Sequence, residues 1–254
     1  MSDIKNSSLV TNLVSYWELE EASGTRVDSH GSNDLTDNNT VGQATGIQGN
    51  AADFTAANDE SLTIADASQS GLDLNSDFSI AGWVRIDTRG KDNGIASKYN
   101  SSSGDRAFMC LITAGNDLQL YLTQTGATSP RVLGESTSEF IEAGDVGNWV
   151  HFAAVFDLSE STVTLYKNGS PVSVSYNNDG TVTSVQNNTV PFALGDANQT
   201  GGDYLDGGLD EIGVWSRMLT SGEVSSLYNS GAGLPYDAAG AAPSLDNALA
   251  WCNF

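Results

Sequence analysis

The sequence predicts an all-β protein in which antiparallel strands form a sandwich. Apolar and polar residues alternate in several segments, and this period of two is that of a strand, whose successive side chains point to opposite faces. Turn-forming residues recur about every ten residues, a spacing that is typical of a sandwich and leaves little room for the helices of a βαβ protein. The composition agrees, with 27 glycines, only five prolines and many Asn, Ser, Thr and Asp residues among 254.

The individual strands follow from the same patterns. The clearest is the segment DFSIAGWVRID at 77–87. Its residues follow a period of two, which assigns successive side chains to opposite faces of a strand. A hairpin is predicted within 162–175, because Asn168 and Gly169 supply the positive φ angles that a type I′ turn needs. The expected strands, in chain order, are 9–19, 51–55, 61–65, 77–87, two within 106–124 joined at 114–117, 148–158, two within 162–175, 190–196 and 205–217.

One short helix is predicted after the last strand. Thr220 and Glu223 have the spacing of a capping box, in which each side chain hydrogen-bonds the backbone N–H of the other residue. Val224 and Leu227 share one face of this helix, and Gly231 is suited to end it. The patterns therefore indicate an all-β fold with one short C-terminal helix.

No tandem repeat or linker interrupts 1–234, so this range is predicted to form one domain, followed by a tail at 235–254. The end of the tail, 245–254, repeats the order of small, aromatic and apolar residues found at 13–19. A strand needs partners for its amides, and Trp251 would be costly to leave in water. We therefore expect 245–254 to form a β-strand or an apolar plug against a sheet edge, on its own domain or on a second copy. The apolar spacing also fits a short helix or a frayed terminus.

The charge balance excludes two classes of partner. Lys and Arg number 10 against 32 Asp and Glu, which gives a formal net charge of −22. Binding to nucleic acid is driven mainly by Lys and Arg that displace counterions from phosphates, so no nucleic-acid partner is expected. An anionic membrane surface is disfavoured for the same reason. No stretch approaches the roughly 20 apolar residues of a membrane helix, so no membrane partner is expected.

The N-terminal segment has no basic head followed by an apolar run, so the chain is expected to be made in the cytoplasm without a signal peptide. The two cysteines, Cys110 and Cys252, lie far apart and form no CxxC pair, so neither a zinc site nor a disulfide framework is expected. Cys110 lies in an apolar run and is predicted to be a small buried hydrophobe.

The sequence resembles the concanavalin A-like lectin/glucanase superfamily, in its laminin-G-like, pentraxin-related branch, and the matching segments follow the family's order. They are LVSYWELEEASGTRVDSHGSNDLT at 13–36, GIQGNAADFTAANDESLTI at 46–64, FSIAGWVRI at 78–86, NWVHFAAVFDLSESTVTLYKNGSPV at 148–172 and LDGGLDEIGVWSRMLTSGEVSSLYNSG at 205–231. The resemblance implies a two-sheet antiparallel jelly-roll sandwich. It does not decide the ligand, because this fold hosts enzymes, lectins and structural modules.

Enzyme activity is not expected. The laminarinase-type members of the superfamily carry two Glu flanking an Asp on one strand, so that all three carboxylates point into the cleft. No such string occurs here, and the acidic clusters lack the required order: Glu18, Glu20 and Glu21 near the start, and Asp206, Asp210 and Glu211 in the late strand. His30 lies in a turn without a nucleophile in a matching context, and His151 lies within a strand, where packing is the expected role.

The resemblance also implies a structural calcium ion. In the resembling families an Asp at the position of Asp210 often helps to hold calcium between the two sheets, and backbone carbonyls from early segments complete the site. Such an oxygen-only coordination sphere suits Ca²⁺. In this chain the carbonyl donor would come from around Gly49, with Asp28 as an additional ligand. The alternative is that Asp210 only caps backbone amides at a sheet edge.

A loop at 196–207 carries the residues expected to bind a ligand. Asn198, Asp203 and Tyr204 lie there on a turn between strands. Amides and carboxylates beside an aromatic ring are the groups that sugar hydroxyls and sugar faces require, although such residues are also common in loops without a ligand. Tyr99 is expected to serve the same end. The tryptophans within strands are expected to pack in the core instead: Trp83, Trp149 and Trp215.

These observations predict a non-catalytic virion-surface or appendage protein of a bacterial virus, acting as a decoration, fibre or tail-associated module. A recognition fold normally found outside cells occurs in a chain without an export signal, and a phage assembles in the cytoplasm and leaves by lysis. The expected partners are a polysaccharide or cell-surface glycan, and other virion proteins or further copies of the chain. The alternative is a carbohydrate-binding module of a secreted bacterial polysaccharide-active protein or adhesin. Neighbouring genes would distinguish the two.

Overall fold

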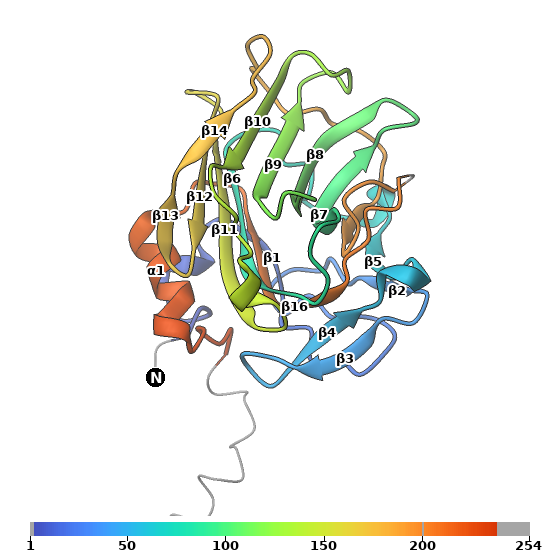
Figure 1. The fold of residues 1–254 in the computed structure, drawn as a ribbon, viewed down its shortest axis with the longest axis vertical. Helices are drawn as coiled ribbons and strands as arrows, with labels where there is room; N and C mark the ends of the chain where they lie inside the picture. Colours follow the sequence, from blue (N-terminus) through green and yellow to red (C-terminus); the bar gives the residue numbers. More distant parts are fainter. Residues whose placement is uncertain (1–2, 200, 238–254) are drawn as a thin grey trace, which may run out of the picture.

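Two antiparallel sheets of eight strands each pack face to face in the computed structural model, which describes residues 3–199 and 201–237 (Figure 1). One short α-helix, α1, follows the last strand of the described chain and packs on the outside of one sheet. The predicted fold class, an all-β two-sheet jelly-roll sandwich with one short C-terminal helix, is confirmed.

The first sheet is built around the long central strands β6, β11 and β16. Its strand order is β13-β12-β11-β6-β16-β4-β3, and β1 also pairs with β16. Every pairing in it is antiparallel. The strands are β1 (Leu13–Trp17), β3 (Gly42–Thr45), β4 (Asn50–Phe54), β6 (Phe78–Ile86), β11 (Trp149–Asp157), β12 (Thr162–Lys167), β13 (Ser170–Val172) and β16 (Gly207–Trp215).

The second sheet has the order β14-β10-β9-β8-β7-β15-β5-β2. The strands β7, β8, β9 and β10 form consecutive antiparallel pairs, so this half of the sheet is a simple meander. The strands are β2 (Thr36–Asn38), β5 (Ser61–Ile64), β7 (Asn93–Asn100), β8 (Asp105–Ile112), β9 (Leu118–Thr123), β10 (Arg131–Ser136), β14 (Val174–Tyr176) and β15 (Phe192–Leu194).

Most predicted strands are present at the expected places, and the Asn168-Gly169 hairpin is confirmed by φ angles of 48° and 76°. Two predictions need correction. The strand expected from residue 9 begins only at Leu13, because a 3₁₀ helix occupies Ser8–Val10. The strands β2, β3, β7, β10 and β14 were not predicted. Further 3₁₀ helices occupy Ala56–Asn58, Asp66–Ser68, Ala143–Asp145 and Asn229–Gly231.

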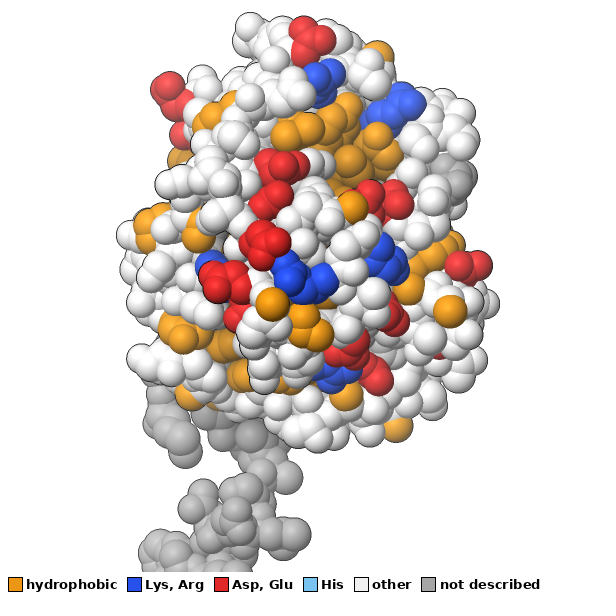
Figure 2. Space-filling model, in the orientation of Figure 1, with side chains coloured by type: hydrophobic (Ala, Val, Ile, Leu, Met, Phe, Trp, Pro, Cys, Tyr) orange, Lys and Arg blue, Asp and Glu red, His pale blue; other side chains and the backbone are white. Residues whose placement is uncertain are grey.

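Figure 2 shows acidic side chains spread across one face of the molecule, with basic side chains at fewer places among them. This distribution agrees with the net charge of −22. A hydrophobic patch is also visible on this face, over β8 and β9 (Figure 2). The helix α1 packs on the outside of the first sheet, whereas no helix of the described chain lies on this patch.

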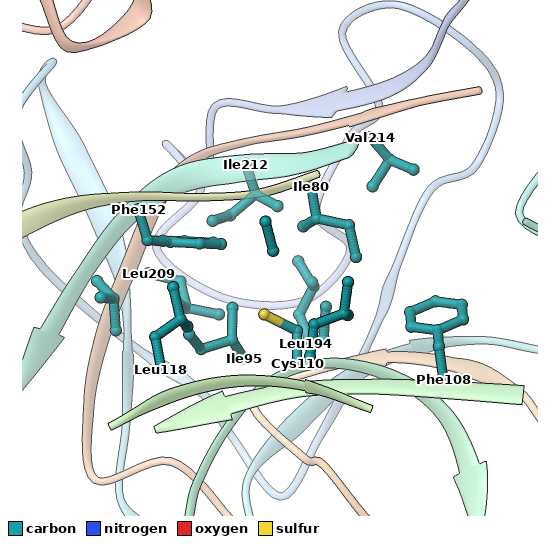
Figure 3. Close-up of a cluster of buried hydrophobic side chains, with 14 of the residues drawn as sticks. Ile80, Ile95, Phe108, Cys110, Leu118, Phe152, Leu194, Leu209, Ile212 and Val214 are labelled. Carbon is teal, nitrogen blue, oxygen red and sulfur yellow. The ribbon is translucent and has the colours of Figure 1, made fainter. Parts of the chain in front are cut away.

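The main hydrophobic core lies between the two sheets. Figure 3 shows Ile80, Phe152 and Ile212 of the first sheet facing Cys110 and Leu194 of the second. The alternation seen in the sequence directs one side chain in two into this layer, as the period of a strand requires. The prediction that Cys110 is buried is confirmed, and burial raises the pKa of its thiol to about 12.

A second hydrophobic cluster covers the outer face of the first sheet. The helix α1 (Ser221–Tyr228) packs there with residues 3–10 and 234–236 of the chain ends. The capping box of Thr220 and Glu223 is confirmed, whereas the helix ends at Asn229, in the left-handed conformation, and not at Gly231. Trp83 and Trp215 are buried as predicted, but both lie on the outside of the first sheet and not between the two sheets.

The beginning of the tail is attached to the N-terminal segment. The carbonyl oxygens of Pro235 and Tyr236 accept hydrogen bonds from the backbone N–H groups of Ile4 and Lys5 at 3.0 and 2.9 Å. The Tyr236 ring stacks on Tyr16. The strand or plug predicted at 245–254 lies outside the described residues. Among the helices of the described chain, none has the length and apolar character needed to cross a membrane.

Candidate functional site

The hydrophobic patch belongs to the outer face of the second sheet, the face that points away from the main core. In β9, Leu118, Leu120 and Leu122 point into the core, so Tyr121 must point to the opposite side. Its antiparallel partners on that side are Met109 in β8 and Leu133 in β10. Their side chains continue the apolar surface on both sides of the tyrosine, and we call this surface the outer face.

Two tyrosines form the centre of the outer face. The rings of Tyr99 in β7 and Tyr121 meet edge to face, with centroids 5.8 Å apart and an interplanar angle of 80°. The exposed fractions of the two side chains are only 8% and 6%, so both rings are held firmly by their neighbours. No described residue hydrogen-bonds either phenol oxygen. Two oriented hydroxyl groups are therefore available to a ligand.

Two arginines lie at one end of the outer face. Arg106, the antiparallel partner of Tyr99, donates hydrogen bonds to the backbone oxygens of Gly126 and Ser101, both at 2.7 Å. Arg131 at the start of β10 is held in the same way by Thr128 and Asn177, at 2.9–3.1 Å. Both guanidinium groups are thereby fixed in place by neighbouring loops.

The two arginines act electrostatically on Tyr121. Burial raises the pKa of the Tyr121 phenol, the nearby Tyr99 adds to this rise, and the positive charges of Arg131 and Arg106 oppose it. Tyr99, Arg106 and Arg131 thus all lie close enough to act on Tyr121. In a chain of net charge −22, two positive side chains thus act on the same phenol.

The predicted ligand loop lies beside this face but only partly contributes to it. The Oδ1 atom of Asn198 accepts hydrogen bonds from the backbone N–H and the hydroxyl of Ser101, and the N–H of Gln199 donates to the carbonyl of Tyr99. These contacts bring Asn198 next to Tyr99, where its side chain holds the loop against the sheet.

Asp203 and Tyr204 lie farther along the same loop. The carbonyl of Asp203 accepts from the N–H of Gly94, and burial raises the pKa of its carboxyl group. Burial, together with the nearby acids Asp196 and Asp59, raises the pKa of the Tyr204 phenol. Of the four residues predicted to bind a ligand, the structure brings Asn198 next to Tyr99, and a side-chain hydrogen bond joins Asn198 to the Asp203 carboxyl group.

The sequence analysis missed Tyr121, Arg106 and Arg131. A signal for Tyr121 existed, because the alternation in LQLYLT directs its side chain opposite to three leucines. No comparable signal marks the arginines, which are brought together by the pairing of β8, β9 and β10.

Asp210, the predicted calcium ligand, is fully buried in β16. Its Oδ2 atom accepts hydrogen bonds from the backbone N–H groups of Ile47 at 2.6 Å and Gln48 at 3.3 Å, whereas Oδ1 has no partner. Burial raises the pKa of this carboxyl group to about 7. The carboxyl group thus caps the turn at 46–49, which is the alternative expected from the sequence.

The other predicted calcium ligands form hydrogen bonds with the backbone. Asp28 accepts four backbone hydrogen bonds in the turn that follows β1, from Tyr16, His30, Gly31 and Asn33. The carbonyl of Gly49 accepts from the N–H of Gly46. In the described part of the chain, no three acidic, His or Cys side chains gather where a metal could sit. The calcium site predicted from Asp210, Gly49 and Asp28 stays a prediction.

His151 has the packing role that the sequence predicts. Its ring lies 5.2 Å from Trp83 and 5.9 Å from Tyr228, and burial lowers its pKa to about 3, so it is neutral. It lines a cavity of about 10 Å³ with Glu211 and Tyr16, whose hydroxyl donates to the Glu211 carboxyl group. The packing predicted for Trp149 is only partly present, since its ring is half-buried.

The model of the concanavalin A-like lectin/glucanases superfamily matches residues 56–225. The chain belongs to this family. The match covers β5 through most of α1 and therefore includes the whole outer face. No curated protein matches the sequence.

Solved structures with the same fold include parts of several larger proteins. The binding domain of Paraclostridial Mosquitocidal Protein 1 is 17% identical, with a TM-score of 0.68, 88% of this chain covered and 53% of that chain. Domain 4 of AbnA, a GH43 extracellular arabinanase from Geobacillus stearothermophilus, is 18% identical, with a TM-score of 0.58 and coverage of 85% and 97%. Trypanosoma rangeli sialidase is 15% identical, with a TM-score of 0.60 and coverage of 89% and 34%. The chain thus spans about half of the toxin binding domain and a third of the sialidase.

Proposed function

We propose that this chain is a non-catalytic glycan-binding domain and that the outer face of the second sheet binds the sugar. The observation that carries the proposal is the pair of tyrosines Tyr99 and Tyr121, whose hydroxyls have no protein partner on an otherwise apolar sheet face. Sugars present alternating apolar C–H faces and hydroxyl groups. A mainly apolar surface with a few oriented polar groups is the complement of such a ligand.

The rigidity of the outer face favours binding. Tyr99 and Tyr121 are more than nine-tenths buried, and Arg106 and Arg131 are held by backbone oxygens. Side chains that are already ordered lose little conformational entropy when a ligand arrives, so more of the contact energy appears as affinity.

The solved structures with this fold support a glycan ligand. The arabinanase domain was solved in complex with arabinotriose, and a botulinum neurotoxin binding domain of the same fold was solved in complex with SialylT. The toxin structures are described as binding domains, which supports binding without catalysis. The family membership is compatible with this role, although the fold alone does not require it.

The sequence also lacks the carboxylate string of the laminarinase-type members of the superfamily. The carboxyl group of Glu135 in β10 accepts a hydrogen bond from Gln119, its partner in β9. Hydrolysis normally requires a pair of carboxyl groups on opposite sides of the glycosidic bond. No Glu-x-Asp-x-Glu string supplies such a pair on any one strand.

Two biological settings are consistent with this proposal. The sequence favours a phage particle, and the similarity to one domain of an extracellular arabinanase favours a secreted polysaccharide-active protein. The first setting is tested by probing purified particles with an antibody against this chain. Absence of the chain from particles of a phage that encodes it would reject the virion setting and leave glycan binding intact.

The function is tested by glycan-array screening of the purified chain, followed by calorimetry with the oligosaccharides that bind. Tyr99→Phe and Tyr121→Phe each remove one hydroxyl and keep the ring. We expect each to weaken binding by about twofold to tenfold, the range for one net hydrogen bond. Tyr176→Phe is the matched control, because Tyr176 is 46% exposed and its hydroxyl bonds Val163 at the edge of the sandwich.

Two results would overturn the proposal. If folded wild-type protein binds no glycan at millimolar concentration, the chain is not a glycan-binding domain. If glycans bind but both tyrosine variants retain wild-type affinity, the outer face is not the site. Release of reducing ends from laminarin, lichenan, agar or alginate would contradict the non-catalytic part of the proposal.

A further inference from the structure

The ten basic side chains of this acidic protein differ in whether they form salt bridges. All ten lie in the described part of the chain, and seven form salt bridges there: Lys5, Arg26, Arg85, Arg89, Lys98, Lys167 and Arg217. Among the other three, Lys91 is surrounded by Asp206, Asp203 and Asp92, whose charges act on it. Arg106 and Arg131 make no ion pair with a described residue.

The two unpaired arginines lie at the same place. Both charges act on the phenol of Tyr121, although Arg106 and Arg131 come from different strands. Their hydrogen bonds go to backbone oxygens and one amide oxygen, which are neutral acceptors. Their positive charges are therefore positioned but not neutralised by the protein.

Each arginine also has donors to spare. A guanidinium group carries five N–H donors. Arg106 uses two of them in hydrogen bonds to the protein, and Arg131 uses three. Both residues are only partly buried. Charge-assisted hydrogen bonds from such fixed donors to an anion are about twice as strong as neutral ones.

We infer that the ligand of the outer face is an anionic glycan, whose carboxylate or sulfate group lies at Arg106 and Arg131 while its hydroxyl groups hydrogen-bond the phenols of Tyr99 and Tyr121. This inference rests on the proposed function and specifies its ligand class. The outer face can contact both the anionic and the apolar parts of such a ligand, because the apolar side chains of Met109 and Leu133 lie next to the tyrosines. An anion bound at this end of the outer face would form ion pairs with both arginines.

The net charge restricts the ligand further. With a formal charge of −22, the molecule as a whole repels polyanions, and this repulsion acts over a Debye length of about 10 Å at 0.1 M salt. A glycan with one or a few separated anionic groups can use the two arginines without bringing many charges close to the acidic surface. The structure thus favours sparsely charged glycans over densely sulfated polymers.

The experiment compares three probes on the wild-type protein by calorimetry: a short oligogalacturonate, the same oligomer with its carboxyl groups methyl-esterified, and a sulfated neutral oligosaccharide of the same length. We expect the esterified oligomer to bind at least about tenfold more weakly than a preferred anionic probe, because it loses charge-assisted hydrogen bonds. Whether the carboxylate or the sulfate probe binds more tightly identifies the anionic group. Affinity for the anionic probe should fall severalfold between about 50 and 500 mM salt.

Variants then locate the anion. Arg131→Gln and Arg106→Gln should remove most of the preference for the anionic probe, while Arg131→Lys keeps part of it because the charge remains. Lys5→Gln is the matched control, since Lys5 is 53% exposed and pairs with Asp237 outside the outer face. Thermal melting identifies any variant that fails to fold, and the comparison of probes on the wild-type protein decides the question without variants.

The outcomes separate this inference from the proposed function. If neutral oligosaccharides bind through the tyrosines and the esterified and free acids bind equally, the glycan-binding function stands and the anionic ligand is rejected. If the preference for anions survives both Arg→Gln variants, the anion lies elsewhere and the inference fails. If no probe and no array glycan binds, both proposals fail together.

Discussion

Asp196 is a buried carboxyl group at the base of the loop that lies beside the outer face. Its exposed fraction is 3%, and it accepts one hydrogen bond from the backbone N–H of Asn198 at 2.9 Å. Its charged neighbours are the acids Asp203 and Asp59. Burial, reinforced by these two charges, raises the pKa of Asp196 from 3.8 to about 6. The stability of the protein should therefore depend on the protonation of this one group.

The direction and size of the effect follow from the pKa difference. The folded protein binds this proton more tightly than the unfolded chain does, so the stabilisation is fully present below about pH 4 and is lost as the pH rises through about 6. A shift of about two units at 1.36 kcal/mol per unit amounts to about 3 kcal/mol in the free energy of unfolding. Asp196→Asn keeps the shape and the hydrogen-bond acceptor but cannot ionise.

The measurement is urea-induced unfolding, followed by tryptophan fluorescence, of the wild type and Asp196→Asn between pH 4 and pH 8. Relative to its value at pH 4, the stability of the variant should gain about 2–3 kcal/mol over the wild type by pH 8, with most of the change between about pH 4 and pH 6. Glu160→Gln is the control, since it also removes one acidic group but from an exposed position. A difference between wild type and Asp196→Asn that stays constant from pH 4 to pH 8 would refute the reasoning.

Two further predictions concern the calcium site and the core. If Asp210 holds a calcium ion, the ion stabilises the folded state by mass action, so a chelator should lower the thermal midpoint of the wild type and leave that of Asp210→Ala unchanged; equal wild-type midpoints with and without chelator would reject the ion. Phe108→Ala should cost about 3–5 kcal/mol in the free energy of unfolding, because the ring is fully buried against Phe78 and Phe192 and leaves a cavity; a loss below about 1 kcal/mol in urea unfolding would show that the core refills this space.

The sequence by itself determined the local structure wherever one residue or one period sets the backbone. Alternation predicted β6, β9 and β11, because a strand that is buried on one face must repeat every second residue. Asn168 and Gly169 predicted the hairpin, and Thr220 with Glu223 predicted the start of α1, because their chemistry acts within a few residues. The order of the matching segments also indicated the superfamily and, with it, the jelly roll.

Irregular or short strands were less visible in the sequence. In β7 the register with β8 shifts between Gly94 and Ala96 and again between Lys98 and Tyr99, so the period of two is interrupted twice. The strands β2, β3 and β14 are each three or four residues long, too short for a period to be recognised. Their formation depends on hydrogen bonds to neighbouring strands, which the local sequence does not specify.

Only the tertiary structure decided where the candidate site lies. Both sheets have an outer face, and the sequence does not say that α1 and the chain ends cover the first sheet while the outer face of the second carries no helix of the described chain. Tyr99 and Tyr121 meet because β8 pairs with both of their strands, and Arg106 and Arg131 are held near them by the loops that follow. Periodicity reports which side of a strand a residue occupies. Which distant residues share that side depends on strand order and register, and these are set by the packing of the whole domain.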